Sequence, residues 1–177
     1  METTQPTARE ASLLMGATMV VTMIGIFIGI FLFFINIDIA VRTAAAVLVG
    51  IVGIISFLRH SVYYESDQLR MGWRQDHPEF QLEVGYANLT LGIWALVAAA
   101  AGWILVCGIM LAAYATYLLC ALLLHLSQAR ARDGPQDPAH RSRVMKSVAS
   151  TGFFVLALIA FALIAFARAG VIPFMQM

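Results

Sequence analysis

Two histidines and one glutamate are the side chains of this sequence that best suit ligand chemistry. His60, Glu83 and His125 each stand where an apolar run meets a polar or charged segment, so the topology derived below places them at one depth on three helices. Neutral imidazole and carboxylate suit zinc, iron or copper, and two axial histidines suit a haem iron. We therefore predict metal ligation by these three residues, with haem or a transition metal as cofactor. The alternative is that each histidine is an interfacial side chain bonded to water or lipid headgroups.

Glu83 has the most demanding position of the three. An acidic group close to hydrocarbon is costly and normally has a partner. The candidate partners are Arg59, His60 and the arginines of segment 127–147. Two interpretations stay open at this point: a structural ion pair or hydrogen bond, and a functional carboxylate that carries protons if the cofactor is redox-active.

Small and polar residues recur along the apolar run around Glu83. Gln81, Gly85, Asn88 and Gly92 are separated by steps of 4, 3 and 4, so they share one face of a helix. Such a face in a membrane helix usually marks close packing against another helix.

A second stripe at helical spacing follows in the next apolar run. It becomes more polar toward its end and consists of Cys107, Met110, Tyr114, Tyr117, Ala121 and His125. It either packs against neighbouring helices, with its tyrosine hydroxyls bonded to them, or lines a cavity that ends at His125. The two stripes together predict a ligand or cofactor pocket lined by His60, Trp73, Gln81, Glu83, Asn88, Tyr114, Tyr117 and His125.

The composition shows which elements must hold these residues. Of the 177 residues 61% are hydrophobic and 12% are charged, whereas a soluble domain is about half apolar and a quarter charged. This excludes a soluble enzyme and a nucleic-acid-binding module, and it indicates an integral membrane protein in contact with the lipid bilayer. The two cysteines exclude a disulfide scaffold, and the net charge of +1 gives no argument about partners.

The apolar runs predict an all-α, polytopic bundle that forms one membrane domain over residues 1–177. A span needs about 20 apolar residues. The run from 84 to 125 is about twice that length, and we expect it to break at Gly102-Trp103. Five spans result, and one long bent helix in that run would reduce them to four. The predicted spans cover 13–37, 39–58, 80–101, 103–126 and 147–168.

Two polar segments, 59–79 and 127–146, lie outside the hydrocarbon in this layout. The first mixes apolar residues such as Tyr63 and Leu69 with charges, which suits a short amphipathic helix on the membrane surface. Of the 11 Lys and Arg, all but Arg42 and Arg168 fall on the side of these segments and the N-terminus. The positive-inside rule therefore predicts a bacterial inner-membrane protein with a cytoplasmic N-terminus and its C-terminus on the opposite side.

Part of the chain, roughly residues 50 to 130, resembles a family of small bacterial and archaeal multi-span membrane proteins of unknown function. The resemblance is carried by His60, Gly72-Trp73, Phe80-Gln81-x-Glu83-Val84-Gly85-x-Ala87-Asn88-Leu89 and His125. It implies that His60, Trp73, Gln81, Glu83, Asn88 and His125 belong to one pattern. No activity comes with that family.

The chain also departs from the family pattern. Glu79 separates Pro78 from Phe80, where a small residue and a proline usually come directly before the Phe. The segment before the last helix is rich in Arg and Pro instead of Asn and Gly. The layout is more distantly similar to the four-helix DoxX-like membrane proteins, which is an analogy of fold alone.

Three functions fit the sequence. The first is a cofactor- or ligand-binding site for a metal, haem or quinone-like headgroup at the cytoplasmic membrane boundary. The second is a non-catalytic assembly factor or accessory subunit, as a homo-oligomer or within a larger membrane complex. The third is a small transporter or channel. We favour the first, because several costly polar groups fall at one depth on different helices.

Overall fold

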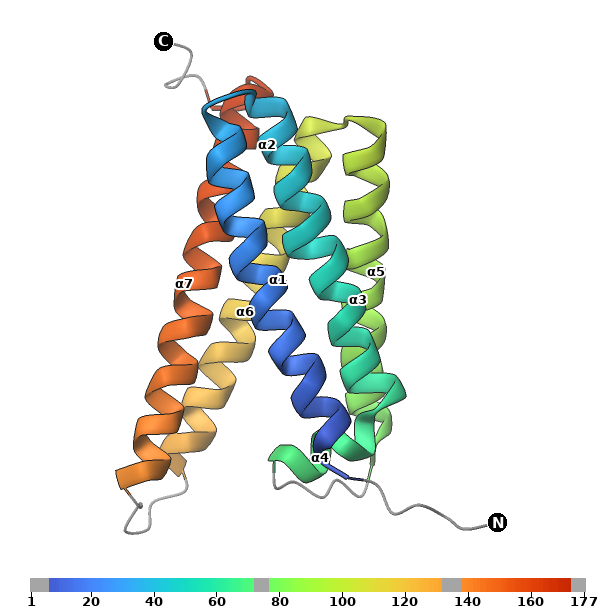
Figure 1. The fold of residues 1–177 in the computed structure, drawn as a ribbon, viewed down its shortest axis with the longest axis vertical. Helices are drawn as coiled ribbons and strands as arrows, with labels where there is room; N and C mark the ends of the chain where they lie inside the picture. The colour runs from blue at the N-terminus through green and yellow to red at the C-terminus, as the bar shows by residue number, and fades with distance from the viewer. Residues whose placement is uncertain (1–6, 72–76, 132–137, 173–177) are drawn as a thin grey trace.

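The computed structural model describes residues 7–71, 77–131 and 138–172, with side chains described outside 128–147. These residues form helices and no strand. The predicted five-span bundle is confirmed, because five helices are long and apolar enough to cross a membrane (Figure 1). They are Arg9–Phe33, Ile37–Val62, Glu79–Ala101, Ile104–Ser127 and Val148–Arg168.

The first two spans are α1 (Arg9–Phe33) and a helix that begins with α2 (Ile37–Ala44). The predicted spans 13–37 and 39–58 place the turn between them at 38, but the chain turns at 34–36. The reason is a cap: the side chain of Asn36 accepts a hydrogen bond from the backbone N–H of Ile39 (3.1 Å). Asp38 therefore lies in the first helical turn, where a carboxylate suits the helix dipole.

The second span is not a uniform α-helix. After α2 it continues as the π-helical segment η1 (Ala45–Ile51), α3 (Val52–Phe57) and a second π-helical segment, η2 (Leu58–Val62). The wider turn of a π-helix shifts the side chains that follow it, and such turns are frequent at functional sites. The segment η2 carries Arg59 and His60 into the end of the bundle.

A short helix and three long helices complete the chain. They are α4 (Tyr64–Met71), α5 (Glu79–Ala101), α6 (Ile104–Ala131) and α7 (Pro138–Arg168). The break between α5 and α6 falls at the predicted position, because Gly102 has a left-handed φ of 72° that ends α5. Arg42 secures this end, since its Nε donates to the carbonyl oxygen of Ala99 (2.7 Å).

Glycines allow the second span and α5 to approach closely. A Cβ added to Gly53 would lie 2.7 Å from the carbonyl oxygen of Asn88, so no larger residue fits without moving backbone. Two glycines of α1 also allow close contact: Gly25 packs against Val47 and Leu48, and Gly29 packs against Phe161. Their G-x-x-x-G spacing thus serves packing within one chain.

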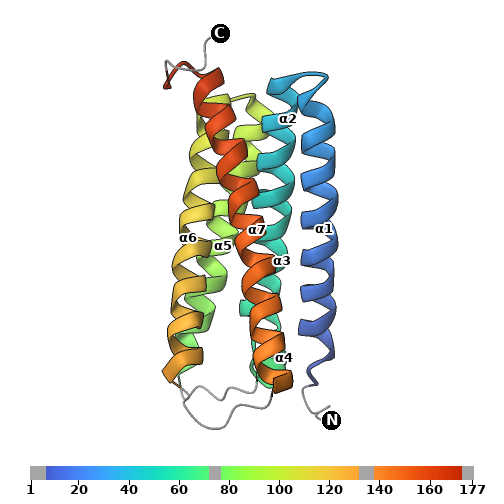
Figure 2. The same cartoon turned by 90° about the vertical axis from the view of Figure 1, so that its left-hand side faces the viewer.

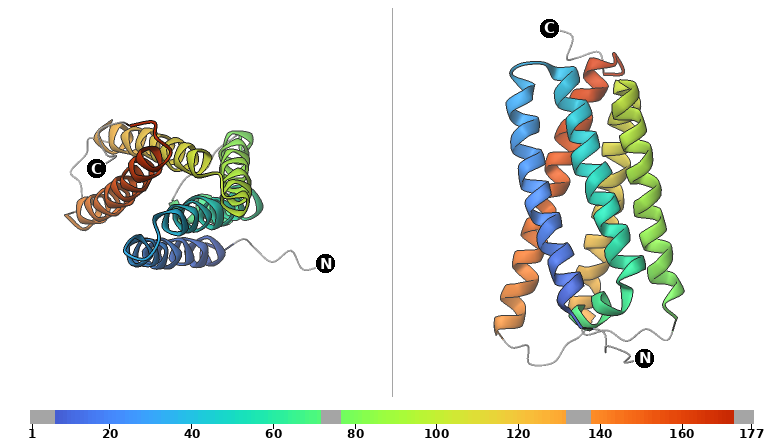
Figure 3. Two further views of the ribbon diagram at one scale, coloured as in Figure 1. Left: turned by 90° about the horizontal axis from the view of Figure 1, so that it is seen from above. Right: turned by 45° about the vertical axis from the view of Figure 1, so that its right-hand side comes forward.

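The two ends of the bundle differ. We call the end where α1 begins and α4 lies the α4 end (Figure 1). The helices α6 and α7 form a hairpin that packs beside α2 at the other end, and toward the α4 end this hairpin separates from α1, α3 and α5 (Figures 1 and 3). The lower part of α4 is visible below α3 in the side view of Figure 2.

Candidate functional site

A buried carboxylate is the centre of the polar contacts at the α4 end. The side chain of Asp67 is completely buried. Its Oδ1 accepts hydrogen bonds from Nε and Nη2 of Arg70 (3.1 and 3.0 Å), and its Oδ2 contacts Nδ1 of His60 (3.0 Å) and Nε2 of Gln81 (3.3 Å). Arg59 is the fifth member, with Nε 3.8 Å from Oδ1. We call these five residues the Asp67 cluster.

The hydrogen bonds of His60 define its protonation state. Nδ1 faces a carboxylate that can only accept, so Nδ1 carries a proton. Nε2 lies 2.7 Å from Nη2 of Arg59, which can only donate, so Nε2 accepts. An imidazole with one donor and one acceptor is neutral. The cluster therefore holds two guanidinium charges against one carboxylate charge.

The charges around Asp67 decide its ionisation. Burial by itself would raise the pKa of the Asp67 carboxyl. The hydrogen bond from His60 and the charges of Arg59 and Arg70 outweigh burial, and the pKa lies below its ordinary value. Asp67 is therefore ionised at neutral pH, although no part of its side chain is exposed.

The same helix is also fixed to the start of α1. Ser66 Oγ accepts from the backbone N–H of Ala11 (3.0 Å), a donor in the first turn of α1, and donates to Oε2 of Glu10 (3.3 Å). Ser66 and Asp67 are the buried residues of α4, whereas Leu69 is exposed. The helix thus turns polar residues toward the protein and apolar ones outward, as predicted for an amphipathic helix on the membrane surface.

A second polar group lies deeper in the bundle, on α5 and α6. Tyr114 donates from its hydroxyl to Oδ1 of Asn88 (3.2 Å), and Nδ2 of Asn88 donates to the hydroxyl of Tyr117 (3.1 Å) and to the carbonyl oxygen of Val84 (2.7 Å). The two tyrosine rings are stacked, with centroids 6.1 Å apart. We call Asn88, Tyr114 and Tyr117 the Asn88 group. Its tyrosine hydroxyls are bonded to a neighbouring helix, as the packing interpretation predicted.

The Asp67 cluster and the Asn88 group are adjacent. Ser56 of α3 lies near the Tyr114 hydroxyl. Arg59 follows Ser56 by three residues and Tyr117 follows Tyr114 by three, so each lies closer to the α4 end on its own helix. Arg59 is accordingly close enough to both tyrosines for electrostatic interaction.

The structure places the eight residues of the predicted pocket in three ways. His60 and Gln81 belong to the Asp67 cluster, and Asn88, Tyr114 and Tyr117 form the Asn88 group. Trp73 lies outside the described residues. Glu83 and His125 are exposed. The predicted face of α5 is correct throughout, because the structure buries Gln81, Gly85, Asn88 and Gly92.

Among the described residues, the structure does not bring the three predicted metal ligands together. In the described ranges no three His, Cys, Asp or Glu side chains are grouped so that they could hold a metal ion, and this includes His60, Glu83 and His125. The last turns of α6, which carry His125, separate from α3 and α5 (Figure 1). Two candidate partners of Glu83, Arg59 and His60, face Asp67 instead, and the arginines of 127–147 lie outside the described side chains.

Sequence reasoning missed Asp67, Arg70 and the role of Arg59. A signal was present: Arg59 and His60 end an apolar span, and basic groups at such a depth need an acidic partner. Asp67 is close in sequence and has Arg70 three residues further on the same helix face. The amphipathic pattern of 59–71 has a polar side as well, and that side contacts the protein through Ser66 and Asp67.

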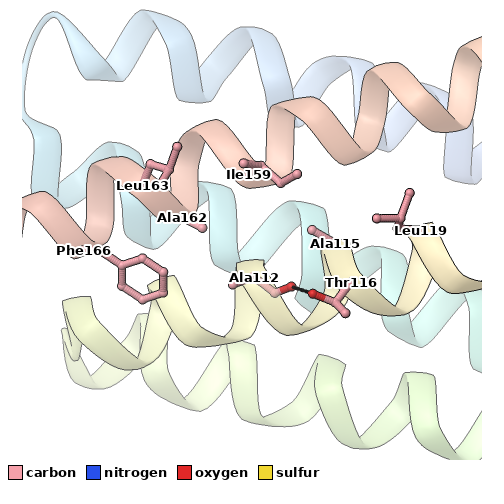
Figure 4. A pocket seen from close by; sticks show the side chains of 8 residues that line it. All are labelled: Ala112, Ala115, Thr116, Leu119, Ile159, Ala162, Leu163 and Phe166. Atoms are coloured by element: carbon pink, nitrogen blue, oxygen red, sulfur yellow. Dashed lines mark hydrogen bonds between the residues drawn. The ribbon is translucent and has the colours of Figure 1, made fainter. Parts of the chain in front are cut away.

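An apolar cavity of about 160 Å³ lies between α6 and α7 (Figure 4). The residues around it are Ala112, Ala115, Thr116, Leu119, Ile159, Ala162, Leu163 and Phe166. Its one hydroxyl, on Thr116, donates to the carbonyl oxygen of Ala112 in its own helix (2.9 Å). The cavity therefore offers no charged or free polar group for orienting a ligand.

Comparison with known proteins identifies a family and no further relative. Neither a curated protein nor a solved structure matches the chain. The model of a family of unknown function, DUF6790, matches residues 12–171, which is nearly the whole chain. The resemblance to a family without known function is thereby confirmed, and the chain belongs to the family of unknown function DUF6790.

Proposed function

We propose that this membrane protein binds a membrane-soluble ligand or cofactor with a polar head at the α4 end, between the Asp67 cluster and the Asn88 group. One observation carries the proposal: the buried polar side chains gather in one half of the bundle. Apart from Thr22, those among the described residues all lie toward the α4 end, and they are Ser56, Ser66, Asp67, Gln81 and Asn88. Buried polar groups are costly, and they cluster at functional sites.

The other half of the core is apolar. Beyond Asn88 the buried hydrophobic positions of the described helices include Leu48, Val49, Ala95, Ala98 and Leu111. A channel or transporter path would cross the whole bilayer, whereas the buried polar side chains of the described residues, Thr22 apart, lie toward one end. A polar site that opens toward one side suits a bound ligand better than a path, so the transporter hypothesis receives less support.

The donor set of the site favours one of the three ligand classes considered. Both ring nitrogens of His60 are engaged, with Asp67 and with Arg59, so neither has a lone pair for a metal or a haem iron. Arg59, Arg70 and Tyr117 are donors of hydrogen bonds. A quinone-like head, which presents oxygen acceptors, fits this set better than a cation does.

The positive-inside rule supplies the orientation of the proposal. With nine of the 11 basic residues on that side, the α4 end faces the cytoplasm and the ligand enters from the cytoplasmic leaflet of a bacterial inner membrane. The apolar side chains of Val62, Tyr63 and Leu69, which are exposed, then face the lipid from which such a ligand arrives.

The test is to identify what remains bound to protein purified in mild detergent. We expect native mass spectrometry to show one organic molecule per protomer in the wild type and in Thr90→Val, whose side chain bonds only within its own helix. Asn88→Leu should lose the molecule. If circular dichroism shows that Asn88→Leu is unfolded, Tyr114→Phe, which removes a single hydroxyl, replaces it in this test.

Two results would contradict the proposal. The first is protein without any bound small molecule, and the second is a molecule retained equally by all variants. Protein without a small molecule but with a stoichiometric partner chain would favour the accessory-subunit function instead. Absorption spectroscopy on the same sample distinguishes a haem from a quinone.

A further inference from the structure

We propose that the head of the bound ligand presents oxygen atoms that accept hydrogen bonds from Nε of Arg59 and from the hydroxyl of Tyr117. This rests on the proposed function and names the chemistry of its ligand. Two membrane-soluble sources carry such oxygens, a quinone carbonyl and a phospholipid phosphate, and the experiment below distinguishes them.

Arg59 provides the first donor. Its side chain is 14% exposed, Nη1 donates to Sδ of Met15 (2.8 Å) and Nη2 donates to His60. Nε is buried and has no hydrogen-bond partner among the described residues, and at 3.8 Å it is too far from Asp67 for a hydrogen bond. Buried donors in proteins nearly always have an acceptor, so this one indicates a missing partner.

Tyr117 provides the second donor. Its oxygen accepts from Nδ2 of Asn88, which uses the acceptor side of the hydroxyl. None of the described residues accepts the hydroxyl proton. Tyr114, the other tyrosine of the Asn88 group, differs because its proton is used in the bond to Asn88.

The two donors face the same region. Ser56 lies near Tyr114 across α3 and α6, Arg59 and Tyr117 each lie three residues further toward the α4 end, and Arg59 interacts electrostatically with Tyr117. There the α6–α7 hairpin begins to separate from α3 and α5 (Figure 1). In the proposed complex, a flat or small head with two oxygens receives one hydrogen bond from Nε of Arg59 and one from the hydroxyl of Tyr117.

The charges of the site agree with an oxygen-rich head. His60 is neutral and Asp67 balances one of the two guanidinium groups, so the Asp67 cluster keeps one surplus positive charge. Glu10 of α1 reaches the neighbouring Ser66 and is bonded to Thr7 and Ser66. A partly or fully negative oxygen is stabilised beside this surplus charge, whereas a metal cation is repelled.

Binding titrations of full-length protein in detergent test the proposal, with decylubiquinone as the quinone probe and dihexanoyl-phosphatidylglycerol as the phosphate probe. The informative variant is Tyr117→Phe. Its control is Tyr86→Phe, because Tyr86 lies on α5 with an exposed side chain and no hydroxyl bond among the described residues. We expect Kd for one probe to rise about fivefold in Tyr117→Phe, the loss of one neutral hydrogen bond, and to stay unchanged in Tyr86→Phe.

Arg59→Lys is the second variant, since lysine keeps the charge and lacks the planar fork of donors. This substitution should weaken the binding of the same probe. A quinone response assigns the site to quinones, and a phosphate response assigns it to phospholipid. Equal affinities for wild type, Tyr117→Phe and Arg59→Lys would overturn the donor assignment. If purified wild-type protein nevertheless retains an organic molecule that Asn88→Leu loses, the proposed function stands without the donor assignment.

Discussion

Replacing Asp67 by Asn isolates the contribution of one buried charge. Asn keeps the size and shape of the side chain but removes the negative charge that faces Arg59, His60 and Arg70. It also presents an amide N–H₂ to groups that are themselves donors. The variant thereby leaves two guanidinium groups at the α4 end without their counter-ion.

The expected cost follows from the burial of the three charged groups. Removing one partner of a fully buried ion pair costs about 3–5 kcal/mol, because the remaining charge is uncompensated. Asp67 is completely buried, but the side chains of Arg70 and Arg59 are 25% and 14% exposed, so water can solvate them in part. We therefore expect a loss near the lower limit, about 3 kcal/mol of unfolding free energy.

The assay is unfolding of detergent-solubilised protein by sodium dodecyl sulfate, followed by circular dichroism. Asp38→Asn is the matched control, because Asp38 forms a bidentate pair with Arg168 (2.7 and 3.3 Å) in which both side chains are substantially exposed. Pairs of this kind contribute little. A loss for Asp67→Asn no larger than that for Asp38→Asn would refute the idea that the Asp67 cluster holds the α4 end together.

Three further predictions concern the same contacts. Because the pKa of Asp67 is lowered in the folded state, the carboxylate contributes fully to stability above its unfolded pKa near 4, and this contribution is lost as the pH falls through the folded pKa. On acidification below about pH 4, the midpoint of unfolding should therefore drop more in the wild type than in Asp67→Asn. Gly53→Ala should lower the thermal midpoint of unfolding, since the new Cβ would meet the carbonyl oxygen of Asn88 at 2.7 Å, whereas Gly16→Ala, with nothing within 4 Å, should leave it unchanged or raise it. His60→Leu should destabilise the protein more than His60→Gln by about 1–2 kcal/mol in the same assay, because Gln can still donate to Asp67 and accept from Arg59, and equal losses would contradict the assignment of a neutral, bridging His60.

The spans could be predicted because hydrocarbon imposes one simple condition on the sequence, a long apolar run in helical form. The inward face of α5 could be predicted for a similar reason, since small and polar residues at helical spacing leave few alternatives. The turn after α1 was misplaced by a few residues, because its position depends on a single side-chain cap, Asn36, within a continuous apolar run.

The partner of Arg59 and His60 could not be predicted from depth alone. Glu83 and Asp67 both lie near the membrane boundary, but which of them faces η2 depends on how α4 folds back onto the bundle. Likewise, a shared depth does not group His60, Glu83 and His125, which form no cluster of metal-binding side chains among the described residues. Hydropathy gives the level of a residue along the membrane normal, and the tilt and rotation of its helix come from tertiary packing.

The close spacing of the Asp67 cluster along the chain bears on how the protein enters the membrane during synthesis. Arg59, His60, Asp67 and Arg70 all lie between residues 59 and 70, directly after the second span. Once that stretch has been translated, the carboxylate of Asp67 can neutralise a guanidinium group, and Ser66 can bond to the start of α1. The contacts that join the first two spans to α4 therefore involve no residue of α5, α6 or α7.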